Sequence, residues 1–190
     1  MLNPISKDSV NDEPGIIALS FITFLGHPGV YYIIYCIGIG VDKMDKVQIE
    51  QKSYEMPPRD GFTITHFLTV ADIERSARFY ERVFGGRILS LGDAKGASGH
   101  IQIANTWLIV NVGGGPTPDK PTIRLSVPAD PDKVSSFMNI RVADIQACYD
   151  LWKSRGAEFI TEPKDKYGEI RCYIRDPDGY IIEVGQSKPD

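Results

Sequence analysis

Cysteine and histidine are scarce in this chain of 190 residues, which has three of each. The cysteines stand at positions 36, 148 and 172, a spacing that matches neither a disulfide framework nor a zinc-binding motif. A reducing cytoplasm is therefore the predicted location. We expect Cys148 and Cys172 to be buried structural thiols rather than nucleophiles, because no histidine lies near either one in the sequence.

The chain also lacks an excess of charge of either sign. Its 21 Lys and Arg residues stand against 25 Asp and Glu residues, for a formal net charge of −4, and 42% of its residues are hydrophobic. This composition is typical of a globular protein and gives no reason to expect a nucleic-acid partner.

Charged side chains are absent from residues 15–41, a stretch of 27 residues. The stretch is long enough to cross a bilayer core of about 30 Å, but Gly26-His27-Pro28-Gly29 interrupts it, and no signal-peptide cleavage site is evident. Three interpretations of residues 1–55 stay open: an upstream translation artefact with the natural start at Met56, a membrane anchor or interfacial segment, and an ordered extra element. A membrane partner is expected only if residues 15–41 exist in the native protein and insert.

An internal repeat organises the rest of the chain. Val70-Ala71-Asp72-Ile73 recurs 72 positions later as Val142-Ala143-Asp144-Ile145. In both copies a strand leads into an amphipathic helix, and the Asp is placed to cap the helix N-terminus. Glycines and short β-rich segments follow each helix, so each copy is predicted to be a β-α-β-β-β module.

The two modules are expected to form one domain over residues 60–187, with modules at about 62–112 and 137–186. Residues 113–136, rich in Gly and Pro, are predicted to be the crossover between them. Asp176-Pro177-Asp178-Gly179 is predicted to be a tight turn between the last two strands, and Lys164-Asp165-Lys166 a solvated turn. A repeat of this kind buries its apolar face against its partner, which predicts an α+β fold with a curved mixed sheet around a shared cavity.

These motifs resemble the vicinal oxygen chelate superfamily, also called the glyoxalase, bleomycin-resistance and extradiol-dioxygenase fold. The resemblance rests on Val70 to Tyr80 with Phe84-Gly85-Gly86, and on Arg175 to Glu183, which contains the Asp-Pro-Asp-Gly turn. It covers about residues 61–186 and implies the fold more strongly than the reaction, because one scaffold carries many chemistries.

Enzymes of this superfamily commonly bind a divalent metal through inward positions on the first and last strand of each module. Alignment with the family pattern, and the 72-residue repeat, place Thr65, Asn111, Phe137 and Glu183 at those positions. Only Glu183 is a usual metal ligand, so no metal site and no cofactor are expected. Nickel, zinc, manganese or iron stays the alternative if a local bulge turns His66 inward. An extradiol dioxygenase is least expected, since it needs two histidines and a carboxylate on one iron.

Strand alternation predicts which side chains face the cavity. In the second module the aliphatic residues are expected to face the helix, which leaves Phe137, Asn139 and Arg141 for the cavity. In the first module the same reasoning places Thr65, Phe67 and Thr69 on the cavity side and His66 among the packing residues. The predicted ligand-binding residues are Phe67, Asn111, Phe137, Asn139, Arg141 and Tyr173. Glu183 is the predicted catalytic residue, because a carboxylate among aliphatic neighbours needs a partner or a task.

Two functions follow as hypotheses. The first is a protein of the bleomycin-resistance kind, which binds a small organic molecule in its cavity without the usual metal. The second is an enzyme, a lyase or isomerase similar to glyoxalase I (lactoylglutathione lyase) or to an epimerase, with Glu183 as metal ligand or base. Superfamily modules often pair across chains, so a homodimer is also expected.

Overall fold

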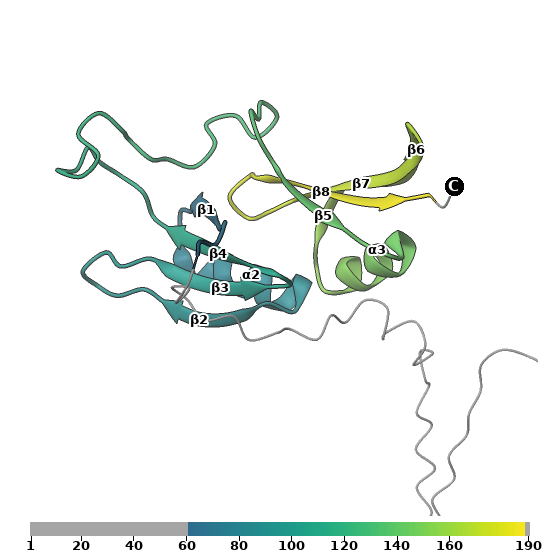
Figure 1. Cartoon of the computed structure of the whole chain (residues 1–190), viewed down its shortest axis with the longest axis horizontal. Coiled ribbons are helices and arrows are strands. Elements are labelled where there is room, and N and C mark those ends of the chain that lie inside the picture. The colour runs from purple at the N-terminus through teal and green to yellow at the C-terminus, as the bar shows by residue number, and fades with distance from the viewer. Residues whose placement is uncertain (1–60, 189–190) are drawn as a thin grey trace, which may run out of the picture.

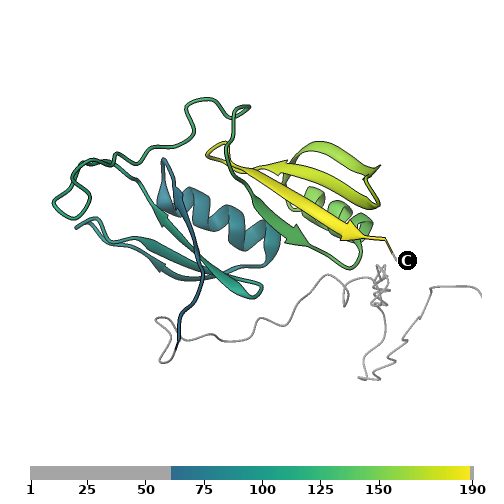
Figure 2. The ribbon, with the colours of Figure 1, turned by 45° about the horizontal axis from the view of Figure 1, so that its top comes forward.

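The computed structural model describes residues 61–188, and the proposals for residues 1–55 lie outside this range. Each module contributes one four-stranded sheet with one helix (Figures 1 and 2). The first module comprises β1 (His66–Thr69), α2 (Ile73–Phe84), β2 (Arg87–Leu91), β3 (Gly99–Ile103) and β4 (Thr106–Asn111). The second comprises β5 (Met138–Arg141), α3 (Ile145–Ser154), β6 (Glu158–Lys166), β7 (Glu169–Arg175) and β8 (Ile181–Ser187).

The two sheets have the same topology. Their strand orders are β1-β4-β3-β2 and β5-β8-β7-β6, with the first strand parallel to the last in each and the other pairs antiparallel. This arrangement confirms the predicted tandem β-α-β-β-β fold. Neither helix within residues 61–188 is long and apolar enough to cross a membrane.

Both helices begin at the predicted aspartates. The side chain of Asp72 accepts a hydrogen bond from Arg75 N at 2.8 Å, and that of Asp144 accepts one from Ala147 N at 2.9 Å. These bonds satisfy backbone donors that have no partner within the first helical turn. Gly85 ends α2 with φ of 71°, in the left-handed region that favours glycine.

Each helix packs against one face of its own sheet, and the two helices meet at one edge. In the first module this core contains Val70, Val83, Leu108 and Val110, and in the second Cys172, Ile174, Ile182 and Val184. The rings of Phe84 and Trp152 lie in edge-to-face contact with centroids 4.9 Å apart, which joins α2 to α3.

The Asp-Pro-Asp-Gly turn fastens the second module to the first. The buried Asp178 carboxylate accepts hydrogen bonds from Ala71 N at 2.7 Å and from Ser76 Oγ, and it pairs with Arg75 at 2.5 Å. Asp176 accepts a hydrogen bond from the hydroxyl of Tyr80, a fully buried residue of α2, at 2.8 Å. The turn therefore has a structural task that its sequence pattern did not reveal.

One predicted turn is wrong. Residues 164–166, expected to be a solvated turn, belong to β6, where Lys164 pairs with Arg171 and Lys166 with Glu169. The turn lies one step later, at Tyr167 (φ 53°) and Gly168 (φ 77°). Two consecutive positive φ angles match the twist of a two-residue hairpin, so β6 and β7 extend to this point.

Residues 112–137 connect β4 of the first module to β5 of the second. They leave β4, run out as an extended arm, and cross to β5 (Figures 1 and 2). Backbone hydrogen bonds between Gly114 and Leu125, both at 2.9 Å, hold the two sides of this arm together.

Candidate functional site

The open face of the second sheet carries most of the predicted site. Strand pairing places Glu183 opposite both Asn139 and Tyr173, so these three side chains share a face. The alternate residues Cys172, Ile174, Ile182 and Val184 form the buried face against α3. The predicted orientation of β5 is therefore the one that the structure has.

Glu183 is held at the centre of this face. Its carboxylate accepts hydrogen bonds from Asn139 Nδ2 at 2.6 Å and from the Tyr173 hydroxyl at 2.9 Å, and Glu183 is only 6% exposed. Burial raises the pKa of the Tyr173 phenol, and the hydrogen bond to Glu183 raises it further, so the phenol keeps its proton and donates it. These two donors orient the carboxylate.

A second polar group lies one step further along the same strands. Arg141 donates to both oxygens of Glu169, at 2.7 and 3.2 Å, and to Ser187 Oγ at 2.9 Å. Arg171 donates to Glu169 at 2.8 Å, and its Nε lies 3.9 Å from Glu183. Hydrogen bonds from the two guanidinium groups lower the pKa of Glu169 to about 2. We name Asn139, Arg141, Glu169, Arg171, Tyr173 and Glu183 the polar network.

The predicted metal positions do not form a ligand set. Backbone hydrogen bonds from Val70 to Asn111 and from Val142 to Gly185 show that Gly185 is the structural counterpart of Asn111. The counterpart of Glu183 is consequently Ile109, two residues before Asn111. The alignment through the 72-residue repeat was wrong at this position, because the last strand is displaced in the second module. The side chains at the four positions are then a threonine, an isoleucine, a phenylalanine and one glutamate. Only the carboxylate is a usual ligand, so the set does not fit a divalent transition metal.

Asn111 lies apart from the polar network. Its side-chain amide donates to Gly96 O at 3.2 Å and to Ser98 Oγ at 3.1 Å, and its Oδ1 accepts from Gly113 N at 2.9 Å. These bonds join the end of β4 to the loop before β3 and to the start of the arm, so they give Asn111 a local structural role.

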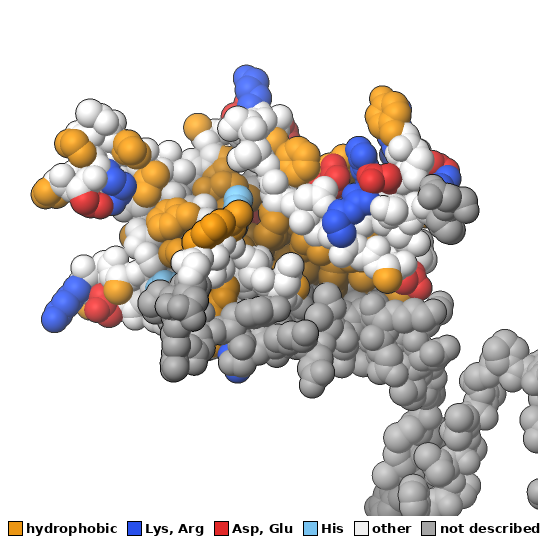
Figure 3. Space-filling view, in the orientation of Figure 1, with side chains coloured by type: hydrophobic (Ala, Val, Ile, Leu, Met, Phe, Trp, Pro, Cys, Tyr) orange, Lys and Arg blue, Asp and Glu red, His pale blue; other side chains and the backbone are white. Residues whose placement is uncertain are grey.

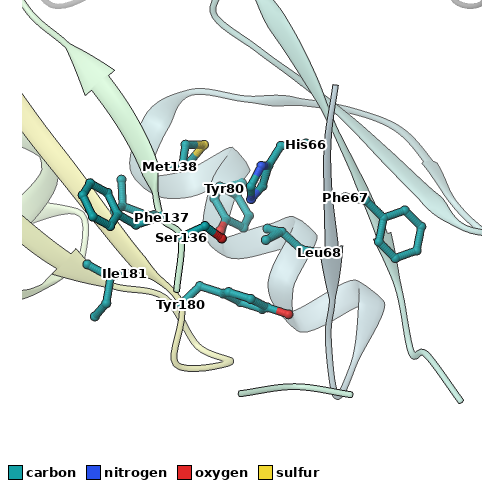
Figure 4. A pocket seen from close by; sticks show the side chains of 10 residues that line it. His66, Phe67, Leu68, Tyr80, Ser136, Phe137, Met138, Tyr180 and Ile181 are labelled. Carbon is teal, nitrogen blue, oxygen red and sulfur yellow. The ribbon is translucent and has the colours of Figure 1, made fainter. Parts of the chain in front are cut away.

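A small pocket of about 90 Å³ is lined by residues of both modules (Figure 4). Leu68, Tyr80, Met138, Tyr180 and Ile182 are among its lining residues. His66 points into it beside Tyr80, and burial lowers the pKa of its imidazole. The β1–β4 pairing runs without a shift from His66 to Thr69, so no bulge turns His66 towards Glu183.

Phe67 and Phe137 lie at this pocket and are 45% and 47% exposed. Two further apolar side chains before β1 are more exposed still, Phe62 and Ile64. Hydrophobic side chains gather over β1, while basic and acidic side chains mix over the β7 and β8 end of the second sheet (Figure 3). The two predicted aromatic contacts are therefore accessible to a ligand or to a second chain.

The two described cysteines are not activated thiols. Cys148 and Cys172 are buried and free, and burial raises the pKa of both thiols to about 12, which keeps them protonated. Within residues 61–188, no three His, Cys, Asp or Glu side chains converge as metal ligands do. Sequence reasoning missed Glu169, whose only signal was its place two residues before Arg171 on a strand.

Comparison with known proteins adds family evidence. The model of the Glyoxalase/Bleomycin resistance protein/Dioxygenase superfamily matches residues 63–184. A probable lactoylglutathione lyase of Vibrio parahaemolyticus serotype O3:K6 is 26% identical over 136 residues, covering 68% of this chain and 93% of that protein. The metallothiol transferase FosB of Shouchella clausii is 28% identical over 119 residues, covering 61% of this chain and 73% of that protein.

Solved structures share the fold. An integron cassette protein from the mobile metagenome of V. cholerae has a TM-score of 0.52 with 21% sequence identity, covering 68% of this chain and 98% of that chain. TioX from Micromonospora sp. ML1 has a TM-score of 0.50 with 20% identity, covering 67% of this chain and 100% of that chain.

Proposed function

The chain belongs to the glyoxalase, bleomycin-resistance and dioxygenase superfamily, and on this premise we propose that it binds a small organic molecule on the open face of its second sheet without the metal usual in superfamily enzymes. Glu183 is the polar anchor, with Asn139 and Tyr173 beside it. Phe137, which precedes β5, and Phe67, which lies on β1 of the first sheet, supply half-exposed aromatic surface for stacking.

The observation that carries this proposal is the donor set around Glu183. Both carboxylate oxygens accept hydrogen bonds from neutral side chains, an amide and a phenol, where a metal site would supply histidine or carboxylate. Thr65, Ile109 and Phe137 stand at the other three positions and add no metal ligand. Such a face is suited to hydrogen bonding and stacking.

The first experiment measures the metal content of the purified full-length protein after incubation with nickel, zinc, manganese and iron and removal of the excess. We expect no stoichiometric metal. One tightly bound ion per chain in the wild type, lost in Glu183→Ala, would contradict the metal-free site and favour the enzyme hypothesis.

A ligand screen by protein-detected NMR tests binding itself. We expect a small organic ligand to shift the signals of residues around Glu183, and Glu183→Gln to weaken its binding by about tenfold or more, because a charge-assisted acceptor is lost. Glu162→Gln, an exposed position on β6, is the matched control. A ligand that binds Glu183→Gln as tightly as the wild type would show that the carboxylate is only structural.

The alternative is a metal-dependent lyase or isomerase of the glyoxalase I or epimerase type. The relative named as a probable lactoylglutathione lyase, which this chain matches over 93% of its length, favours it. An assay for lactoylglutathione lyase activity with and without each added metal separates the two hypotheses. Activity that depends on metal and on Glu183 would establish the alternative.

We also propose that the protein forms a homodimer, in keeping with the half-exposed Phe67 and Phe137. A second copy laid over this surface would bury the aromatic rings and could complete the ligand cavity. Light scattering of the full-length protein gives the mass directly. The cytoplasmic location stays a prediction.

A further inference from the structure

Basic side chains form a row across the second sheet, next to Glu183. Strand pairing places Gly185 opposite Arg141 on one side and opposite Arg171 on the other, and Arg171 opposite Lys164 on β6. Directly paired residues present their side chains on the same face. The row therefore reads Arg141, Gly185, Arg171, Lys164 across the four strands β5, β8, β7 and β6.

Gly185 opens the middle of this row. A Cβ atom at this position would lie 2.4 Å from Arg141 Nη1 and 3.1 Å from Arg141 Cζ. Any side chain here would therefore displace the guanidinium group. Because it is glycine, the Arg141 guanidinium lies directly over the backbone of β8 and reaches towards Arg171 on β7.

The row and its acidic neighbours carry an excess of positive charge. Arg141, Arg171 and Lys164 of the row and the adjacent Lys166 are four cations, and Glu169 and Glu183 are the two carboxylates beside them. These six side chains sum to a formal charge of about +2 at neutral pH, whereas the whole chain carries −4. The basic and acidic side chains in this part of the molecule are visible in Figure 3.

Glu169 occupies the space between the two arginines as an oxyanion ligand would. Its oxygens receive 2.7 and 3.2 Å hydrogen bonds from Arg141 and a 2.8 Å bond from Arg171. Its side chain is 26% exposed and comes from the first residue of β7, beside the Tyr167-Gly168 turn. At this strand end the side chain can rotate into solvent, which would leave two converging guanidinium groups.

We propose that Arg141 and Arg171 form an oxyanion subsite, in which a carboxylate, phosphate or phosphonate group of a ligand replaces the side chain of Glu169. This inference rests on the proposed function and narrows the ligand class. The ligand thus has an anionic group at the arginines and, beside it, a hydrogen-bond donor for Glu183, because Arg171 Nε lies 3.9 Å from the Glu183 carboxylate.

The test is a titration of the full-length protein with inorganic phosphate, and separately with acetate, at constant ionic strength set with sodium chloride. The reporters are the Nε–Hε NMR signals of Arg141 and Arg171. In Glu169→Gln the competing carboxylate is gone, so we expect at least one anion to bind about tenfold or more tightly than to the wild type. Glu81→Gln, which removes one of the two carboxylate partners of Arg78 on α2, is the control with the same change in charge.

Arg171→Gln gives a second, independent test in the wild-type background. We expect it to abolish the anion-induced shift of the Arg141 signal. Equal affinity of Glu169→Gln and Glu81→Gln for both anions, or shifts that persist in Arg171→Gln, would overturn the subsite. If neither anion binds while an uncharged ligand from the screen still binds at Glu183, only the proposal of an oxyanion subsite is wrong. If the anions bind but no organic ligand does, the proposed function is wrong and the subsite stands.

Discussion

The two sheets share one topology but present different open faces. In the first sheet Phe67 pairs with Ile109, and neither residue is charged or polar. At the equivalent place in the second sheet Asn139 pairs with Glu183 and donates a hydrogen bond to its carboxylate. Each helix-facing core is aliphatic, so the duplicated fold keeps its packing while the exposed faces differ. The polar network therefore lies in one of the two modules.

The connections differ as well. Ala104 and Asn105 join β3 to β4, whereas Asp176 to Tyr180 join β7 to β8. The longer connection holds the two modules together, because Asp176 and Asp178 both contact α2 of the first module. The second module thus supplies both the polar network and the contact that holds the two modules together. We name this contact, formed by Asp176 and Asp178 with α2, the clasp.

The largest expected effect comes from breaking this clasp. Asp178→Ala removes a fully buried carboxylate and leaves Ala71 N, Ser76 Oγ and Arg75 without their acceptor. We expect the free energy of unfolding to fall by about 2–4 kcal/mol. Urea denaturation measures the change, with Asp165→Ala, at an exposed residue of β6, as the control. A loss no larger than that of the control would show that the turn does not hold the modules together.

Making the second sheet resemble the first should have a smaller effect. Glu183→Ile copies the residue found at Ile109 and leaves the Asn139 amide and Tyr173 hydroxyl without their acceptor. We expect a loss of about 1–3 kcal/mol in the free energy of unfolding. The double variant Asn139→Phe/Glu183→Ile reproduces the pair Phe67 and Ile109 and should recover part of that loss. A double variant less stable than Glu183→Ile would argue against the structural equivalence of the two pairs.

Removing one hydroxyl from the contact between the modules should have a milder effect. Tyr80→Phe deletes the 2.8 Å hydrogen bond to Asp176 while keeping the buried ring. We predict a decrease of about 1 kcal/mol in the free energy of unfolding. Tyr149→Phe, whose hydroxyl accepts from the exposed Lys153, should change stability less. Thermal or urea unfolding of the two variants side by side decides between them.

The smallest expected effect is a pH dependence of stability that comes from His66 in the first sheet and not from Glu169 in the second. Burial lowers the pKa of His66 below 6.5, so the unfolded chain binds a proton more readily than the folded one. Stability should therefore fall as the pH decreases below about 6.5, and His66→Gln should reduce that slope. Glu169 on the second sheet, with a pKa of about 2, stays ionised throughout this range. An unchanged slope between pH 7.5 and 5.5 in His66→Gln would show that another group is responsible.

Much of the fold could be predicted from local patterns. The repeated Val-Ala-Asp-Ile segments, the helical spacing after them and the glycines at the helix ends are local signals, and the capped helices confirm them. Strand alternation placed Asn139 and Arg141 on the open face for the same reason. The end of β6 was misjudged, because Tyr167 gives no turn signal and only its pairing with β7 reveals the extent of the strand.

The site was predicted only in part, because hydrogen-bond partners depend on strand register. Glu183, Asn139 and Tyr173 were named from the sequence, and the structure brings them together. The constant 72-residue repeat assigned Asn111 as the counterpart of Glu183. The strand pairing assigns Ile109 instead, because the spacing between the first and last strands differs between the two modules. Glu169 and the clasp at Asp178 were not predicted, since their partners lie on other strands or in the other module.

The sequence by itself determined the family, the tandem modules and the helix caps, because each of these follows from residues close together in the chain. The tertiary structure decided which residues meet: Ile109 as the counterpart of Glu183, Glu169 between two arginines, and Asp178 under α2. These contacts depend on register and on the packing of one module against the other. Residue types and local spacing do not contain that information.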